Sequence, residues 1–190
     1  MTDNENEQKS DETDNKYIFV QESHIHNKGV FAKIDIPKGT EIIEYIGEKV
    51  SKEEGSKRLD QSYQRHQADP DYHAATYIFE LNDEYDLDGD VPNNPAKYIN
   101  HSCDPNCEIE IVGDHIWIFA TRDIKKDSEL HYNYGHDLNK EDLYDFKKHP
   151  CYCGSPKCVG YIIDEDEWPK MKELLEKEKS QSIKIRPDFD

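Results

Sequence analysis

The sequence predicts a single domain of mainly β structure, and three observations support this fold class. From Tyr17 onward, short runs of β-branched and aromatic residues alternate with Gly, Pro, Asn and Asp, which is typical of strands joined by turns. Helical patterning is confined to two segments. A length of 190 residues suits one domain with appendages, because a chain of this size builds one sizeable core.

The predicted strands are short and are bounded by turn residues. They are YIFV (17–20), GVFAKIDI (29–36), TEIIEYIGEKV (40–50), TYIFELN (76–82), EIEIV (108–112), HIWIFA (115–120) and ELHYNY (129–134). The turn VGDH predicts a hairpin, because isoleucines alternate with other residues on both sides of it. The segment IPKG predicts a second tight turn.

Two segments have helical patterning. SKEEGSKRLDQSYQRH (51–66) lacks Pro and β-branched residues, and Ser51 with Glu54 three residues later is a capping-box signature. WPKMKELLEKEKS (168–180) has a proline near its start and places Met171, Leu174 and Leu175 on one face.

The charge balance indicates the kind of partner. Lys+Arg number 24 and Asp+Glu 42, a net charge of −18, of which the first 16 residues account for −4 and residues 17–190 for −14. Such an acidic body repels phosphate backbones and anionic lipids and attracts Lys-rich segments. We therefore expect a basic protein or peptide partner, no direct nucleic-acid binding, no membrane association and a monomeric state.

The start of the chain is polar and carries no signal-peptide pattern. Residues 1–15 contain no aromatic residue and are expected to form a disordered acidic tail. No apolar run approaches the roughly 18 residues of a membrane helix. We expect an intracellular protein. In a eukaryote it would lie in the nucleus, and in a bacterium it would lie in the cytoplasm or be exported as an effector.

Five cysteines lie in the second half of the chain, which favours metal binding in a reducing compartment over a disulfide framework. CYCGSPKC places Cys151, Cys153 and Cys158 within eight residues, so three thiolates can converge on one ion. A closed tetrahedral Zn²⁺ site needs a fourth ligand. Cys103 and Cys107 are the remaining thiols, and either can complete the site.

Six motifs stand in a fixed order along the chain: HNKGVFA (26–32), IPKGTEIIEYIGE (36–48), TYIFEL (76–81), DGDVPNNPAKYINHSCDPNC (88–107), ELHYNYG (129–135) and CYCGSPKC (151–158). Together they resemble the SET-domain protein-lysine methyltransferases that carry a cysteine-rich post-SET segment. The resemblance extends from about Ile25 to Ile163. INHSCDPNC, ELHYNYG and the cysteine-rich tail in register make it specific.

The resemblance implies a SET fold of several small curved sheets, in which the NHSC segment is threaded beside the ELHYNY strand as part of a knotted C-terminal region. The expected divisions are the tail (1–15), the SET domain (16–136) with a helical insertion (51–75), a linker and post-SET zinc segment (137–163), and a charged C-terminal helix and tail (164–190).

The resemblance also implies the site residues. S-adenosylmethionine (SAM) would be held by Lys28, Gly29, Val30, Tyr77, Lys97, Tyr98, Asn100, His101, Tyr134 and Tyr161. The catalytic residues would be Tyr134, near the transferring methyl group, with Tyr132 and Tyr45 in the lysine channel. One structural Zn²⁺ would bind Cys103, Cys151, Cys153 and Cys158, which leaves Cys107 as the alternative ligand.

The implied reaction is methyl transfer from SAM to a lysine amine in a basic, possibly histone or histone-like, protein segment. Methyl transfer is an in-line displacement, which requires alignment and exclusion of water but no protein nucleophile. Tyr132 at the position two before Tyr134 implies mainly monomethyl-lysine as product. An alternative is a catalytically weak SET fold that serves as a zinc-stapled module for basic peptides.

The sequence departs from the family pattern at four positions. Asn27 and Asn93 replace glycines, and Asn is the next-best residue for a positive φ. Lys97 replaces an arginine and loses its planar fork. Asn133 replaces an aspartate between the two tyrosines. The departures leave the tyrosines and the Asn100–His101 pair intact.

Overall fold

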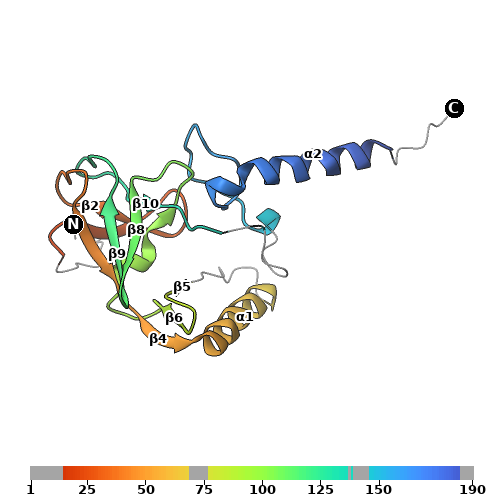
Figure 1. The fold of residues 1–190 in the computed structure, drawn as a ribbon. Helices are drawn as coiled ribbons and strands as arrows, with labels where there is room; N and C mark the ends of the chain where they lie inside the picture. The colour runs from red at the N-terminus through yellow and green to blue at the C-terminus, as the bar shows by residue number, and fades with distance from the viewer. Residues whose placement is uncertain (1–14, 69–76, 137, 139–145, 185–190) are drawn as a thin grey trace, which may run out of the picture. The chain divides into compact units, whose positions relative to one another are not determined.

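The computed structural model describes residues 15–68, 77–136, 138 and 146–184. The chain divides into two compact units, Met1–Asn100 with Asn106–His131 and His101–Pro105 with Tyr132–Asp190. Figure 1 traces the chain from β1 to α2. The predicted N-terminal tail up to residue 14, the end of the helical insertion and most of the linker after residue 136 lie outside the described residues.

In the described part of the chain, four small sheets of two or three strands confirm the mainly β prediction (Figure 1). The sheet orders are β1 (Ile18–Glu22) with β2 (Lys28–Ala32), β3 (Glu41–Tyr45) with β9 (His115–Ala120) and β8 (Cys107–Val112), β4 (Glu48–Ser51) with β6 (Tyr85–Asp88) and β5 (Ile78–Glu80), and β7 (Asn100–His101) with β10 (His131–Tyr132). The pairing of β7 with β10 confirms that the NHSC segment lies beside the ELHYNY segment. The threading of the chain stays a prediction.

The β8–β9 hairpin forms as predicted. Val112 pairs with His115 across the turn, and Gly113 supplies the positive φ of 63° that the turn requires. The alternation of isoleucines buries Ile116 and Ile118 completely, and both lie in the first unit's core. The predicted IPKG turn is also present, with the Thr40 N–H donating to the Pro37 carbonyl at 3.2 Å.

Two predicted strands are shorter or divided in the structure. TEIIEYIGEKV separates into β3 and β4, which pair with different strands, β9 and β6. ELHYNY forms a named strand only at β10, preceded by an isolated bridge of Glu129 with Phe31. Beyond it, the N–H groups of Tyr134 and Gly135 donate to the side chains of His101 and Asn133, so they are not available to a strand partner.

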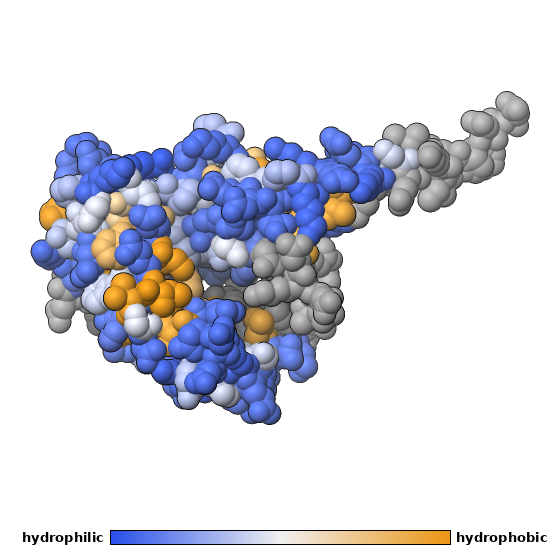
Figure 2. Space-filling model, viewed as in Figure 1, coloured by the Kyte–Doolittle hydropathy of each residue, from blue (hydrophilic) through white to orange (hydrophobic). Residues whose placement is uncertain are grey.

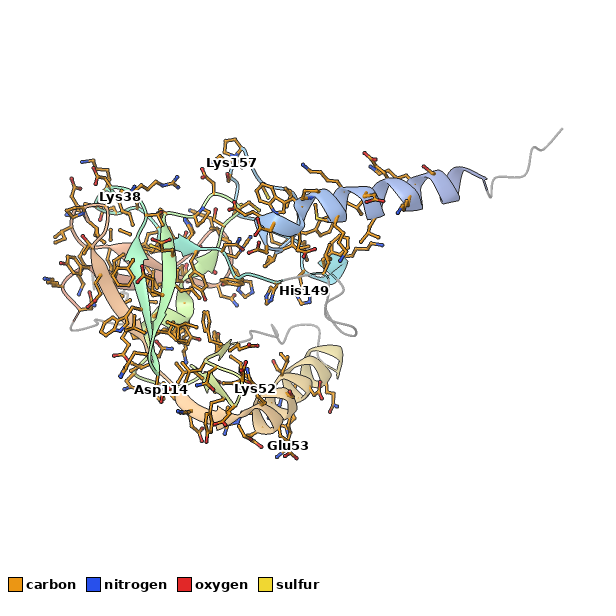
Figure 3. The ribbon with its side chains drawn as sticks, in the orientation of Figure 1. Lys38, Lys52, Glu53, Asp114, His149 and Lys157 are labelled. Carbon is orange, nitrogen blue, oxygen red and sulfur yellow. The ribbon has the colours of Figure 1, made fainter. Side chains whose placement is uncertain are left out.

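The helical insertion contains α1 (Lys52–Ala68), which begins where the capping signature predicted. The Ser51 hydroxyl accepts a hydrogen bond from the Glu54 N–H at 3.2 Å. Arg58 then ties the helix to the β4–β6–β5 sheet, since its guanidinium lies 2.8 Å from Glu48 and 2.6 Å from Asp88. Figure 3 labels Lys52 and Glu53 at the start of this helix.

The second unit contains η2 (Phe146–Lys148), η3 (Glu165–Glu167) and α2 (Trp168–Lys184). Its core is Phe146, Ile163 and Met171, with partly buried neighbours Leu138, Val159, Tyr161, Trp168 and Leu175. Leu174, predicted on the same apolar face, is 38% exposed, so α2 buries only part of that face. The visible surface of α2 in Figure 2 is mostly hydrophilic. Within the described ranges, no helix has the length and apolar character to span a membrane.

The paired strands of the hairpin provide a test of the core. Ile116 is 0% exposed and Ile111, its register partner on β8, is 46% exposed. We expect Ile116→Ala to reduce the free energy of unfolding by about 2–5 kcal/mol, because it leaves a cavity in the core. Ile111→Ala, the matched control, should cost less than about 1 kcal/mol. Urea unfolding measures both, and equal losses would contradict the placement of the core.

Candidate functional site

The segment from Asn100 to Cys103 supplies side chains to two separate clusters. Asn100 belongs to the first unit, where its amide donates a hydrogen bond to the Lys28 carbonyl at 3.1 Å. His101 and Cys103 belong to the second unit. All three side chains are buried. One short segment therefore carries two residues predicted to bind the cofactor, Asn100 and His101, and one predicted metal ligand, Cys103.

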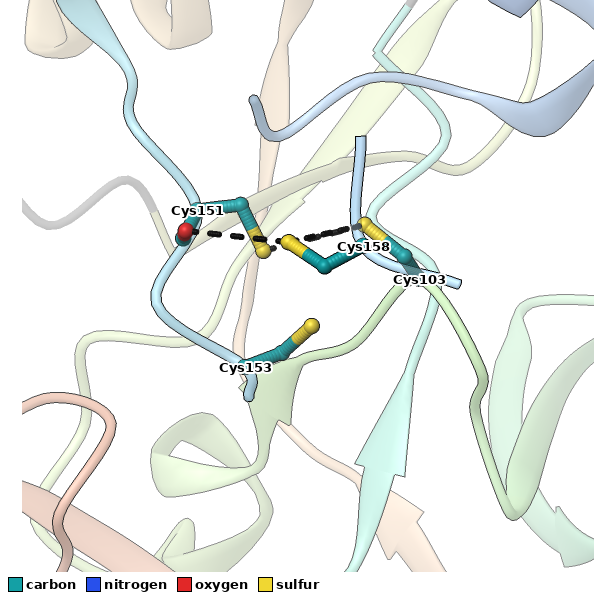
Figure 4. A group of neighbouring side chains, drawn as sticks. All are labelled: Cys103, Cys151, Cys153 and Cys158. Atoms are coloured by element: carbon teal, nitrogen blue, oxygen red, sulfur yellow. Dashed lines mark hydrogen bonds between the residues drawn. The ribbon is translucent and has the colours of Figure 1, made fainter. Parts of the chain in front are cut away.

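In the second unit, four cysteines form a cluster with metal-ligand geometry. The sulfur atoms of Cys103, Cys151, Cys153 and Cys158 all lie within 4.8 Å of one another, and Figure 4 shows them turned toward a common centre. Cys103 Sγ is 3.7 Å from Cys151 Sγ and 3.9 Å from Cys158 Sγ. A tetrahedral Zn²⁺ with bonds of about 2.3 Å separates its sulfur ligands by about 3.8 Å. The donor set therefore fits zinc, and Cys107 is not part of it.

Short turns bring the three C-terminal cysteines together. Gly154 and Gly160 adopt positive φ values of 67° and 86°, and the Cys158 N–H donates to the Ser155 carbonyl at 2.9 Å. The Cys151 N–H bonds the Gly160 carbonyl at 3.0 Å and closes the loop at its base. The two glycines allow the turns that bring the three sulfurs together.

The thiols of the cluster differ in acidity. Burial raises the pKa of Cys103 to about 11 and holds the pKa of Cys151 well above its usual range. Burial acts in the same direction on Cys153, but hydrogen bonds with the backbone of Cys103 and Ser155 outweigh it and lower that pKa to about 7. A divalent cation must displace the remaining thiol protons, so metal affinity should fall as the pH falls.

His101 connects the cysteine cluster to the predicted catalytic tyrosine. Its Nδ1 accepts a hydrogen bond from the Tyr134 N–H at 3.2 Å, which assigns the ring proton of the neutral imidazole to Nε2. Nε2 lies 3.7 Å from Cys103 Sγ, so this N–H points at the sulfur. The rings of Tyr134 and Tyr132 lie 5.1 Å apart between centroids, and Tyr132 is buried. The second unit thus brings together His101, Tyr132 and Tyr134.

In the first unit, the Asn100 amide has a second partner that the sequence reasoning missed. Its Nδ2 lies 2.8 Å from Oε1 of Glu129, and the Ser23 hydroxyl donates to the same oxygen at 2.8 Å. The only signal for Glu129 was its place as the acidic residue of ELHYNYG. The adjacent predicted residues Gly29 and Val30 are buried in β2. The turn before them uses Asn27 with a positive φ of 39°, as predicted.

The predicted residues Lys97, Tyr77, Tyr98 and Lys28 also lie together in the first unit. Lys97 Nζ bonds Asp90 at 2.9 Å and lies 5.4 Å from the ring centroids of both Tyr77 and Tyr98. Lys28 Nζ lies 5.1 Å from the Tyr98 ring. Lys97 therefore keeps a cation beside two aromatic rings at the position where the family pattern has arginine.

The remaining predicted residues have well-defined partners. Tyr45 is 1% exposed, and its hydroxyl donates to the Tyr77 carbonyl at 2.8 Å. In the second unit, the Tyr161 ring packs edge-on against Phe146 at 5.0 Å. Asn133 donates to Asp164 Oδ2 at 3.2 Å. Asn93 has no positive φ, so its replacement of glycine introduces no left-handed backbone.

Comparison with known proteins assigns the family. The SET-domain family model matches residues 27–135, more than half of the chain. The chain therefore belongs to the SET-domain family, a family of protein-lysine methyltransferases. The cysteine cluster that follows fits the post-SET segment found in part of this family.

Three similar relatives are named histone-lysine N-methyltransferases. The chain is 41% identical to TRX1 of Oryza sativa subsp. japonica over 146 residues, 75% of this chain and 13% of that protein. It is 36% identical to trithorax of Drosophila virilis over 155 residues, 80% of this chain and 4% of that protein. It is 37% identical to histone-lysine N-methyltransferase 2D of Homo sapiens over 149 residues, 76% of this chain and 2% of that protein. The chain thus spans only a small part of the length of these relatives.

The cysteine cluster generates a metal prediction. We expect elemental analysis of protein purified without added metal to give about one zinc per chain, and Cys103→Ser to lose it, because a closed site needs four ligands. Cys107→Ser is the matched control, since Cys107 is also buried but lies outside the cluster. Full zinc content in Cys103→Ser would contradict this ligand set.

Proposed function

We propose that this chain is a SAM-dependent methyltransferase that acts on the side-chain amine of a lysine in a basic protein segment, such as a histone or histone-like tail. The observation that carries the proposal is membership of the SET-domain family with Asn100, His101 and Tyr134 in its motifs. The names of the relatives and the net charge of −18 support a basic histone-like substrate.

The residues of the first unit fit a cofactor with a hydrogen-bond donor. Both amide hydrogens of Asn100 are engaged, by Lys28 and Glu129, and its Oδ1 accepts no hydrogen bond within the described part of the chain. We propose that SAM is held by the residues that the family resemblance implies, which are Lys28, Gly29, Val30, Tyr77, Lys97, Tyr98, Asn100, His101, Tyr134 and Tyr161.

SAM supplies an electrophilic methyl group on a sulfonium. The protein must align the lysine nitrogen with that methyl group and exclude water. It must also favour the neutral amine, whose ordinary pKa is about 10.4, and an apolar aromatic channel does so by penalising the charged form. We assign the channel to Tyr45, Tyr132 and Tyr134. The hydroxyl of Tyr45 is engaged by the Tyr77 carbonyl, so Tyr45 contributes chiefly its ring.

One structural Zn²⁺ at the four cysteines would fix the position of Cys103, and through His101 that of the Tyr134 backbone. The metal would take no part in the chemistry. We further propose that the protein acts as a monomer without direct nucleic-acid contact, and that in a eukaryote it works in the nucleus, where histones are the abundant basic substrates.

Radiolabelled methyl transfer to core histones and to a panel of other basic proteins tests the proposal. We expect transfer by the wild type, and its loss by at least about 100-fold in Tyr134→Phe with SAM affinity retained, because the hydroxyl acts at the reacting centre. Tyr152→Phe, on a 67% exposed tyrosine, is the matched control and should keep full activity. SAM binding without transfer by the wild type would favour the alternative of a peptide-binding module.

The product distribution depends on Tyr132. Its hydroxyl can hold a water molecule or the amine in the channel, which leaves less room for a methylated nitrogen to rotate into line. We expect mainly monomethyl-lysine from the wild type and a shift toward di- and trimethyl-lysine in Tyr132→Phe, with the first methylation step preserved. Mass spectrometry of a methylated peptide measures this. Abundant trimethyl-lysine from the wild type would refute the role.

A further inference from the structure

We propose that Glu129 is a positioning residue that orients and polarises the Asn100 amide, so that Oδ1 of Asn100 receives the α-ammonium group of the cofactor. This inference rests on the proposed function, because it assumes that SAM is the ligand. Glu129 itself touches neither cofactor nor substrate in this role. All of the residues involved belong to the first unit.

The orientation of the amide follows from its two neighbours. The Lys28 carbonyl and the ionised Glu129 carboxylate can only accept hydrogen bonds, and they lie 3.1 Å and 2.8 Å from Asn100 Nδ2. The nitrogen must therefore face both of them. Oδ1 is left as an acceptor without a donor from the described residues. Without Glu129, one of the two interactions that fix this orientation would be lost.

The Glu129 carboxylate is a partly buried anion without a permanent counter-ion. Its side chain is 13% exposed. Burial by itself would raise the pKa of this carboxyl, but the nearby His131 ring and the hydrogen bonds from Asn100 and Ser23 outweigh burial and lower the pKa. Among the described residues, no lysine or arginine forms an ion pair with it, and His131 Nε2 lies 3.8 Å from its Oε2. Such an anion favours a cationic group nearby.

The absence of a side chain at Gly29 leaves room for the Glu129 carboxylate. A Cβ at Gly29 would overlap Oε1 of Glu129 and come within 2.9 Å of Ser23 Cβ. Gly29 has no positive φ, so the absence of a side chain there serves close packing and not backbone conformation. The carboxylate thus packs against the backbone of β2 while its Oε1 accepts from the Asn100 amide.

The position of Asn100 indicates which cofactor group it meets. Its Nδ2 bonds Lys28 in the HNKGVFA turn, which resembles the turn that meets the methionine part of SAM. The hydrogen-bond donor in that part of SAM is the α-ammonium group. A carboxylate that accepts from the amide N–H increases the electron density on Oδ1 and strengthens its bond to a cation. The contribution of Glu129 to binding affinity should therefore depend on whether the ligand carries the α-amino group.

Calorimetric dissociation constants of two ligands test this dependence without an activity assay. The ligands are S-adenosylhomocysteine and its analogue that lacks the α-amino group. We expect Glu129→Ala to weaken the binding of S-adenosylhomocysteine by roughly tenfold or more, as for a lost hydrogen bond to a charged group. Binding of the analogue without the α-amino group should weaken by less than about twofold. Glu129→Gln, which keeps an acceptor oxygen and the side-chain size, should give a smaller loss with the same selectivity.

Ser23→Ala is the matched control, because it removes the other donor to the same oxygen and leaves the Asn100 contact in place. It should change neither dissociation constant by more than about twofold. Equal losses for both ligands in the Glu129 variants, or no loss in either, would overturn the inference. Failure of the wild type to bind S-adenosylhomocysteine or SAM would instead overturn the proposed function on which it rests.

Discussion

A metal ion bound by the four convergent cysteine sulfurs would hold together the second unit, whose buried apolar core is small among the described residues. Phe146, Ile163 and Met171 are its core residues, and so few side chains provide limited hydrophobic stabilisation. With a metal ion bound, the sulfur cluster would cross-link Cys103 to cysteines about 50 residues further along the chain. Because a metal ion would bind the folded arrangement and not the separated thiols, its binding free energy would become folding free energy for this unit.

His101 links the cysteine cluster to the predicted catalytic residue Tyr134. A single imidazole faces Cys103 Sγ with one nitrogen and the Tyr134 N–H with the other, so the position of the tyrosine backbone depends on where the sulfur is held. This arrangement explains why an amide, an imidazole and a thiol occupy residues 100–103. Asn100 serves the first unit, and the next residues serve the second.

Local sequence signals predicted much of the fold because they act over a few residues. Ser51 capped α1, Gly113 and Gly39 allowed the predicted turns, and Asn27 took a positive φ. Other predictions were less accurate where contacts distant in sequence decided the outcome. The ELHYNY strand ended at Tyr132 because the next N–H groups bond side chains, and Leu174 stayed partly exposed because α2 buries only part of its apolar face.

The sequence by itself determined the mainly β class, the spacing of the cysteines and the order of the family motifs, because these depend on residue type and local spacing. Only the tertiary structure decided between Cys103 and Cys107 as the fourth member of the cluster, since both are buried thiols near the same turn. It also revealed Glu129 as the partner of Asn100. A hydrogen bond across 29 residues depends on how the strands pack, and no local pattern in the chain encodes that packing.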